Sequence, residues 1–330
     1  MLSSLDYMKK DMARVEEVID ASLSYKDALM GRVGRHLAAA KGKRLRPMLM
    51  LLSARLQGVP RLTLAHARVA AGLEMVHLAT LLHDDVIDKA QTRRGRPSVN
   101  AQWGDDVAIL MADHLFSDAF TMILREAGIE AVMALTHATR EMCQGEMFQI
   151  EKRGKLLSVE DYLAIITAKT ARLFAACAEV GAWMAGAPAP AVEAMKQFGL
   201  LFGIAFQITD DLLDYTATGK KWGKGVGTDI SNGRQTLPFI HALSKARGDD
   251  RAFLLATLNN GDGKANGDGR ANGDLARVVE CLRRHGGIDH SQQLARDYTR
   301  RALSALDPLP ATPIRRRLER LASDILSREY

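Results

Sequence analysis

The same acidic pattern occurs twice in this chain, each time at the end of a long, mostly apolar segment. The pattern is Asp-Asp-x-x-Asp, and its two copies are Asp84, Asp85 and Asp88, and Asp210, Asp211 and Asp214. On a helix, positions i, i+1 and i+4 lie close together, with i and i+4 on one face. Six carboxylates on two apolar helices are costly to bury unless cations neutralise them. Carboxylate oxygens suit Mg²⁺, which usually shares its ligand shell with phosphate. The repeat therefore predicts a metal-bound diphosphate held between two helices.

A single acidic triplet is more often a solvated helix face or a loop at a helix end than a metal site. Two copies with identical spacing, each after an apolar run, seldom arise by chance. Metal binding is therefore the favoured interpretation.

The composition indicates a globular protein with a large core. The chain has 330 residues, of which 47% are hydrophobic and 25% are charged, as is typical of soluble domains. Nothing between about residues 10 and 240 looks like a linker, so we expect a single domain over residues 1–330. No signal peptide and no uncharged apolar run of about 18 residues are visible, so we expect no transmembrane helix. Cys143, Cys177 and Cys281 are odd in number and widely spaced, which predicts reduced packing residues in a cytoplasmic protein.

The net charge of +6 does not indicate nucleic-acid binding, because aromatic residues make up only 5% of the chain and no basic-aromatic motif is present. Much of the basic excess lies near the C-terminal end, as in Arg315, Arg316 and Arg317. Two interpretations stay open for it, a solvated helix face and attraction to anionic lipid. The second would allow peripheral membrane contact during product release.

Apolar residues recur at intervals of three and four along most of the chain, which predicts an all-α fold. The longest predicted helices cover residues 62–82, 106–127, 130–151 and 192–213. Strand-like alternation is essentially absent. Several helices are apolar on more than one face, which favours a central bundle wrapped by other helices, or a large dimer interface. The Asn/Gly/Asp-rich repeat at about residues 259–274 should be a mobile loop, with the helical pattern resuming at Leu275.

A basic cluster precedes one of the predicted helices. Lys43, Arg44 and Arg46 lie just before or beside Pro47, a residue suited to a first helical turn. Cations at a helix start form an anion site, although a plain surface cluster is the commoner explanation. His77 lies two turns before Asp84 on the same predicted helix, so it can face the same cavity.

Further cations follow each acidic motif. Arg93 and Arg94 come one short loop after the first motif and could clamp phosphate oxygens. Lys169 and Thr170 lie inside an apolar helix, where a cation either needs a partner or must extend to solvent. Two more basic residues, Lys224 and Arg234, follow the second motif. Together the cations and carboxylates favour two diphosphates with Mg²⁺.

These motifs resemble the trans-isoprenyl diphosphate synthases, most closely the long-chain octaprenyl and heptaprenyl diphosphate synthases. The matching strings are GKRLRP (42–47), HLATLLHDDVID (77–88), RRG (93–95), GE with Gln149, KT (169–170), FQITDDLLD (206–214), GK (223–224) and GTDI to GRQTLP (227–238). The departures are modest: Arg234 replaces a usual Lys, Met111-Ala112-Asp113 replaces a usual Gly-Asp pair, and Gln144 replaces an often acidic residue.

The resemblance implies an all-α isoprenoid-synthase-type bundle around a deep central cavity, assembled as a homodimer. It implies that Asp84, Asp88 and Asp210, supported by Asp85, Asp211 and Asp214, hold three Mg²⁺ on an allylic diphosphate. It implies that this site is completed by Arg93, Lys169, Thr170, Gln207 and Lys224. It further implies that isopentenyl diphosphate is bound by Lys43, Arg46, His77 and Arg94. Arg234 is expected to bind substrate as well.

The expected reaction breaks an allylic C–O bond, which leaves a carbocation and a diphosphate. Metal and cationic side chains stabilise the leaving group, and apolar walls exclude water. The isopentenyl double bond attacks the cation, and a proton then leaves, with the released diphosphate as the base. Two rivals stay open. A class I terpene cyclase would need no second diphosphate site, and a non-catalytic partner subunit should have lost carboxylates.

Product length depends on the residues beside the first motif's helix. Ala79 and Thr80 lie one turn before Asp84 and are small, and Val76 one turn further back is of moderate size. Leu135, about 21 Å along its helix from Gln149, is the candidate floor. This depth predicts a product of about C30–C40, such as a quinone side chain, from helical turns of roughly 5.4 Å per five-carbon unit. A short-chain geranylgeranyl or farnesyl diphosphate synthase is the alternative, because Phe116 and Phe120 could intrude and shorten the tunnel.

Overall fold

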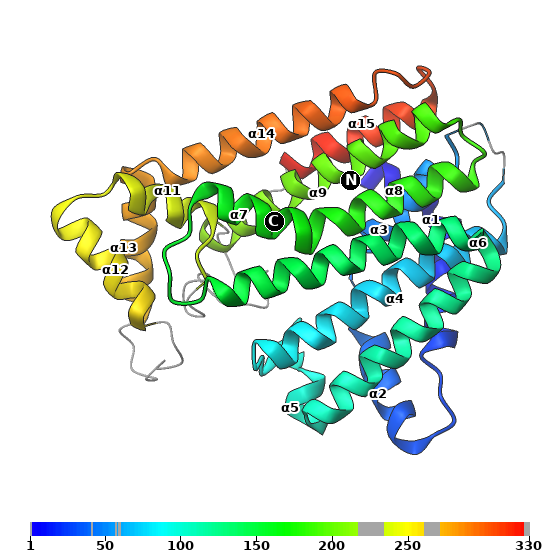
Figure 1. Ribbon diagram of the computed structural model, residues 1–330, viewed down its shortest axis with the longest axis horizontal. Coiled ribbons are helices and arrows are strands. Elements are labelled where there is room, and N and C mark those ends of the chain that lie inside the picture. Colours follow the sequence, from blue (N-terminus) through cyan, green and yellow to red (C-terminus); the bar gives the residue numbers. More distant parts are fainter. Residues whose placement is uncertain are drawn as a thin grey trace. The chain divides into compact units, whose positions relative to one another are not determined.

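The structure is a computed structural model, and it describes residues 2–40, 42–56, 58, 61–216, 234–260 and 271–326. The predicted all-α architecture is confirmed (Figure 1). The helices are α1 (Leu2–Ser22), α2 (Ala28–Ala39), α3 (Leu45–Ser53), α4 (Leu64–Ile87), α5 (Val99–Trp103), α6 (Asp105–Glu151), α7 (Val159–Ile166), the π-helix η1 (Thr167–Ala171), α8 (Arg172–Met184), α9 (Ala189–Thr216), α11 (Leu237–Lys245), α12 (Gly248–Asn260), α13 (Ala271–Arg284), α14 (Gly287–Ala305) and α15 (Pro313–Leu326).

The chain divides into two compact units, and each is described by itself. The first unit comprises Met1–Thr139, Leu173–Gly199 and Ala305–Leu321. The second comprises Arg140–Arg172, Leu200–Ser304 and Ala322–Tyr330. Asp84 therefore belongs to the first unit and Asp210 to the second. The expectation of a single domain stays a prediction.

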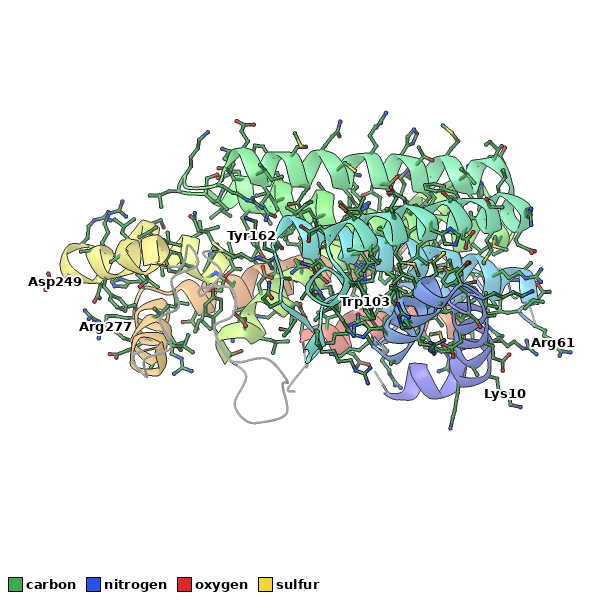
Figure 2. All side chains as sticks on the ribbon, turned by 90° about the horizontal axis from the view of Figure 1, so that it is seen from below. Lys10, Arg61, Trp103, Tyr162, Asp249 and Arg277 are labelled. Carbon is green, nitrogen blue, oxygen red and sulfur yellow. The ribbon has the colours of Figure 1, made fainter. Side chains whose placement is uncertain are left out.

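Helix α4 is the core of the first unit and packs against α1 and α3. Val69, Leu73 and Val76 are fully buried on it, and each such side chain stabilises the fold by roughly 1.5–3 kcal/mol. Helix α6 approaches α4 closely, since a Cβ added at Gly72 would lie 2.9 Å from the side chain of Ile123. Charged side chains such as Lys10 and Arg61 lie on the outside of the helices (Figure 2).

Helix α6 joins two helices that the sequence predicts separately. Its backbone leaves helical geometry at Gly128, where φ is 83° and ψ is −176°. Only glycine adopts such a conformation readily, so this residue sets the kink. By length and composition alone, α6 is long and apolar enough to cross a membrane, but the core helix of a soluble protein passes the same test, so the expectation of no transmembrane helix stays a prediction.

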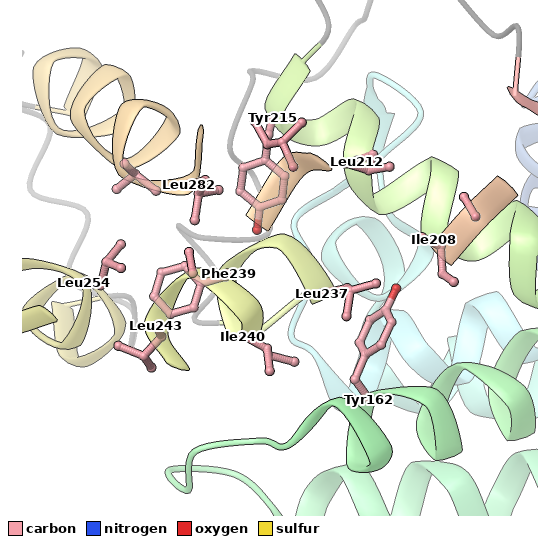
Figure 3. Packing of buried hydrophobic residues seen from close by; sticks show 14 of the residues in the cluster. Tyr162, Ile208, Leu212, Tyr215, Leu237, Phe239, Ile240, Leu243, Leu254 and Leu282 are labelled. Atoms are coloured by element: carbon pink, nitrogen blue, oxygen red, sulfur yellow. The ribbon is translucent and has the colours of Figure 1, made fainter. Parts of the chain in front are cut away.

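The core of the second unit forms around α11, which packs against α7, α12 and α13. Figure 3 shows Phe239, Ile240 and Leu243 of α11 among the buried side chains of this cluster. Tyr162 of α7 and Tyr215 of α9 belong to the same cluster, and each is 3% exposed. A phenol buried this deeply needs a partner for its hydroxyl group.

Two local features differ from the prediction. A short antiparallel hairpin of β1 (Thr92–Arg93) and β2 (Arg96–Pro97) interrupts the helices. Helix α13 begins at Ala271, four residues before the predicted Leu275, so helix formation extends into the Asn/Gly/Asp-rich repeat. Residues 261–270, the centre of the predicted mobile loop, lie outside the described residues.

A buried ion cluster fixes the backbone that leads into α3. Arg44 is 5% exposed, and its guanidinium donates to Glu74 Oε1 at 2.9 Å and to Glu16 Oε1 at 2.7 Å. Burial opposes the charge of Arg44, but the hydrogen bonds and charges of Glu16 and Glu74 outweigh it and raise the pKa. Arg44 also takes a left-handed backbone conformation with φ of 52°. The ion cluster therefore fixes the backbone at Arg44, between Lys43 and Arg46.

We predict that Arg44→Met lowers the free energy of unfolding by about 3–5 kcal/mol, because the carboxylate of Glu74 is left buried without its counter-charge. Arg68→Met is the control, since Arg68 forms an ion pair of 2.7 Å with Glu126 at the surface and should change stability by about 1 kcal/mol at most. Urea titration of both variants measures the two effects. Equal destabilisation would contradict a structural role for the buried cluster.

Candidate active site

The first acidic motif forms the last turn of α4. The Asp88 N–H donates to Asp84 O at 2.8 Å, so the two residues stand one turn apart, and both are half-buried. The helix then ends in a Schellman motif, in which the Ala90 N–H donates to Asp85 O at 2.8 Å and Lys89 is left-handed with φ of 51°. Asp84 and Asp88 thus form an accessible carboxylate pair on one helix face.

Asp85 has a different environment, because it points into the protein. Its side chain is buried and accepts a hydrogen bond from Arg93 Nε at 2.9 Å, with a second, shorter contact from the same guanidinium. The hairpin makes this pair possible. Arg94 and Gly95 form its two-residue turn, with φ of 52° and 74°, as in a type I′ turn. Arg93 is therefore held by Asp85, while its predicted contact with an allylic diphosphate stays a prediction.

A cationic cluster surrounds His77, two turns before Asp84 on α4. Burial and the positive charges of Arg46, Arg94, Arg93 and Arg44 hold the pKa of His77 well below its ordinary value. His77 is therefore neutral at pH 7 and can hydrogen-bond an anion without adding charge. The structure thus brings Arg46, Arg93, Arg94 and His77 together, as an anion site requires.

Contacts within the same unit fix two of these cations. Arg94 donates to Ala40 O at 2.6 Å, which holds the hairpin tip against the segment before α3. The Arg46 guanidinium lies 4.4 Å from the centre of the Phe174 ring, a cation–π contact. Lys43 is exposed beside them.

The second motif shows the same division between outward and inward carboxylates. Asp210 is exposed and Asp214 is half-buried, whereas Asp211 is 8% exposed. Asp211 accepts hydrogen bonds from the Tyr162 hydroxyl at 2.6 Å and from Gln207 Nε2 at 2.7 Å. In both motifs, therefore, the middle aspartate is hydrogen-bonded to protein donors and the outer two are the more accessible.

Lys169 and Thr170 lie in the π-helix η1, a rare conformation that is frequent at functional sites. Lys169 forms an ion pair with Glu146 and donates to Gln149 Oε1 at 3.1 Å, so the predicted need for a partner is confirmed. Gly145 permits this approach, since a Cβ there would lie 2.6 Å from Ala168 Cβ.

The predicted chain-length residues are mostly buried. Val76, Ala79 and Leu135 are fully buried, and the Thr80 hydroxyl donates to His77 O at 2.8 Å. Phe116 lies beside the first motif, with its ring 5.9 Å from that of His83. Its neighbour Phe120 stacks on it at 6.3 Å. Phe116 is thus placed next to α4, with Phe120 stacked on it.

Two of the predicted substrate-binding residues, Lys224 and Arg234, follow the second motif in the sequence. Lys224 lies outside the described residues. Arg234 is described and exposed. Their roles stay predictions.

The outer aspartates of the first motif are chemically suited to bind Mg²⁺. Asp84 and Asp88 present hard oxygen ligands from one helix face, as Mg²⁺ requires. Across the ranges described above, no three His, Cys, Asp or Glu side chains come together as a complete ion site. An ion bound there would complete its shell with water and substrate oxygens, which is the usual arrangement for Mg²⁺.

Sequence reasoning missed several residues that the geometry makes important. Glu74 and Glu16 neutralise Arg44, and Glu146 neutralises Lys169. The signal for Glu74 was present, because a lone carboxylate inside an apolar helix needs a cation. Tyr162 gave no signal, since its distance of 49 residues from Asp211 conceals their contact.

Comparisons with known proteins agree with this geometry. The sequence model of the family described as Polyprenyl synthetase matches residues 27–270. The chain belongs to this polyprenyl synthetase family. It is 33% identical to the octaprenyl diphosphate synthase of Escherichia coli (strain K12), over 97% of this chain and 96% of that protein. It is 34% identical to a short chain isoprenyl diphosphate synthase of Methanothermobacter thermautotrophicus, over 100% of both chains.

The solved structures extend this result to the fold. A polyprenyl synthase from Caulobacter crescentus CB15, complexed with calcium and isoprenyl diphosphate, is 35% identical to this chain. The TM-score is 0.90, covering 99% of this chain and 97% of that one. The predicted family, the isoprenoid-synthase type of all-α fold and the assignment as a prenyltransferase are therefore confirmed for this polyprenyl synthetase.

Replacing His77 with Gln should make the free energy of unfolding depend less on pH in the acidic range. The folded-state pKa of His77 is depressed by burial and the arginine cluster, so the unfolded chain takes up the proton first. The stability from neutral His77 is present above about pH 6.5 and is lost as the pH falls towards the folded pKa. We expect His77→Gln to lose less unfolding free energy than the wild type between about pH 7.5 and pH 5.

Urea unfolding at a series of pH values measures this difference, with His137→Gln as a control at an exposed histidine of α6. A His77→Gln profile parallel to that of the wild type would show that burial and the arginine cluster do not depress the pKa of His77.

Proposed function

We propose that this polyprenyl synthetase condenses an allylic diphosphate with successive isopentenyl diphosphates in a Mg²⁺-dependent reaction. The proposed product is a trans-polyprenyl diphosphate of about C30–C40, used for a quinone side chain. One observation carries the proposal: α4 presents the carboxylates of Asp84 and Asp88 at its end and a cationic cluster around neutral His77 two turns earlier. The first group suits a metal-bound diphosphate, and the second suits a diphosphate bound by cations alone.

Magnesium would be held by Asp84, Asp88 and Asp210, with Asp214 in support, and we propose three ions. When bound, it would supply positive charge to the departing diphosphate. The roles of Asp85 and Asp211 as metal ligands are proposed only as secondary, because both are buried and bonded to protein donors.

The side chains of the protein itself would bind and orient the two substrates. Lys169, Thr170 and Gln207, with Arg93 and Lys224, would bind the allylic diphosphate. The isopentenyl diphosphate would be bound by Lys43, Arg46, His77 and Arg94. Because His77 is neutral at pH 7, it can donate one hydrogen bond while the arginines supply the charge. No side chain is required as the base, since the released diphosphate can take the proton.

A short-chain product is the second candidate, and one observation favours it. Phe116 lies next to the first motif's helix with Phe120 stacked on it, and these bulky rings could close the tunnel early. The longer product is favoured by the small size of Ala79 and Thr80 and by the depth of the predicted tunnel floor at Leu135, which is buried. The paired acidic motifs favour a prenyl diphosphate synthase over a terpene cyclase or a non-catalytic subunit.

We also propose that the protein acts in the cytoplasm as a homodimer. Each subunit would form a single domain over residues 1–330. Helix α6 exposes large apolar side chains in the first unit, which is typical of an interface. These side chains are Ile109 at 40%, Leu110 at 68%, Leu124 at 48%, Ile129 at 54% and Met133 at 48% exposure. Contact with anionic lipid through the basic C-terminal region is proposed as a further, peripheral interaction.

A single assay tests the proposal. The purified protein is incubated with isopentenyl diphosphate, an allylic primer and Mg²⁺, and the dephosphorylated products are separated by length. Chain elongation that requires Mg²⁺ supports the function. Cyclised hydrocarbon would indicate a terpene cyclase, and no product in the presence of both substrates would indicate a non-catalytic subunit.

Asp84→Ala and Asp210→Ala should each lower turnover by roughly 10²–10³-fold or more, because each removes a ligand that orients the diphosphate. Both variants should stay folded, since removing a carboxylate relieves repulsion within the motif. Asp106→Ala, at an exposed aspartate in the first turn of α6, is the control and should keep wild-type turnover. Near-wild-type turnover of either motif variant at saturating Mg²⁺ would refute the two-motif site.

Product length should respond to the tunnel residues in opposite directions. Ala79→Phe should shorten the products to about C15–C20, because a ring one helical turn before Asp84 blocks the growing chain. Leu135→Ala should lengthen them, because it lowers the floor. Chromatography of the dephosphorylated products measures both. A wild-type series that ends at C15 or C20 would exclude the long tunnel.

A further inference from the structure

Tyr162 lies where α7 meets the second acidic motif. Its side chain is 3% exposed, and its hydroxyl donates to Asp211 Oδ2 at 2.6 Å. Figure 3 shows the ring rising from α7 beside Leu237, with the hydroxyl directed towards the helix that carries Ile208. A capping box of Ser158 and Asp161 fixes the start of α7, so Tyr162 is held one turn into a well-defined helix.

The hydroxyl of Tyr162 is the first member of a chain of hydrogen bonds that reaches the π-helix. Asp211 Oδ1 accepts from Gln207 Nε2 at 2.7 Å, and Gln207 Oε1 accepts from the Thr170 hydroxyl at 2.8 Å. An ionised carboxylate can only accept hydrogen bonds. Asp211 therefore requires the amide nitrogen of Gln207 to face it, which turns the amide oxygen towards Thr170. The orientation of two predicted substrate-binding residues thus follows from the position of Asp211.

We propose that Tyr162 is a positioning residue for the allylic diphosphate site. By holding Asp211 inward, it keeps Gln207 and Thr170 in one arrangement and leaves Asp210 and Asp214, on the same helix, as the accessible carboxylates of the motif. This proposal rests on the function proposed above. Its effect is on binding of the allylic substrate, and isopentenyl diphosphate binding is not affected.

Tyr215 offers a matched comparison within the same core. It is also 3% exposed and belongs to the same buried cluster as Tyr162. Its hydroxyl lies 2.5 Å from Thr236 Oγ1. Replacing either tyrosine with phenylalanine removes one buried hydroxyl and keeps the ring. The Tyr162 hydroxyl bonds to a motif carboxylate and the Tyr215 hydroxyl to the hydroxyl of Thr236, so a difference between the two variants reports positioning rather than packing.

The test compares Tyr162→Phe and Tyr215→Phe by steady-state kinetics and by calorimetric titration with an unreactive allylic thiolodiphosphate in the presence of Mg²⁺. Tyr162→Phe should raise both the KM for the allylic substrate and the Kd of the analogue by about tenfold, because a hydrogen bond to a buried charge is lost. Its KM for isopentenyl diphosphate should change by less than about twofold. Tyr215→Phe should keep both allylic constants within about twofold of the wild type.

A double-mutant cycle with Asp211→Asn makes the coupling explicit. If Tyr162 acts through Asp211, the double variant should bind the analogue no more weakly than Asp211→Asn alone. Additive losses, or equal effects of Tyr162→Phe and Tyr215→Phe on analogue binding, would overturn the proposal and leave Tyr162 as a packing residue. Absence of chain elongation by the wild-type protein would instead refute the proposed function, so the two failures are distinguishable.

Discussion

The cost of placing charge on apolar helices governs the arrangement of this protein. A carboxylate or ammonium group removed from water must be paired or strongly hydrogen-bonded. Glu74, Asp85 and Asp211 are all buried, and each accepts a hydrogen bond from a side chain outside its own helix. Arg44 joins α1 to α4 in this way, Arg93 closes the hairpin onto the end of α4, and Tyr162 joins α7 to α9. The contacts that neutralise these charges therefore also fix the elements that carry the site.

Helix geometry explains why the two acidic motifs divide in the same way. Positions i and i+4 share a face, while i+1 lies about 100° around the helix. If Asp84 and Asp88 face outward, Asp85 must turn towards the neighbouring protein, where Arg93 meets it. The same applies to Asp211 between Asp210 and Asp214. The two motifs thus resemble each other in space as well as in sequence, with the middle aspartate buried and bonded to protein donors and the outer two more accessible.

The sequence was sufficient to predict the long helices, because apolar periodicity over twenty residues leaves few alternatives. It also placed His77 two turns before Asp84 on the same helix, because a spacing of seven residues is local. It could not predict the π-helix at Lys169, because a π-turn differs from an α-turn by one residue and leaves no clear pattern. Nor could it predict Tyr162 with Asp211 or Arg44 with Glu74, which are contacts between segments far apart in the chain. The short hairpin was missed because two-residue strands are too brief to show alternation.

We propose that the two acidic motifs act on one diphosphate through bound Mg²⁺. The most direct measurement is the Mg²⁺ dependence of the affinity for an unreactive allylic thiolodiphosphate in the wild type, Asp84→Ala and Asp210→Ala. We expect tight binding by the wild type only with Mg²⁺, and a loss of the Mg²⁺-dependent part of the affinity in both variants, although their substitutions lie in different motifs. Binding that is independent of Mg²⁺, or that is weakened by only one of the two substitutions, would contradict it.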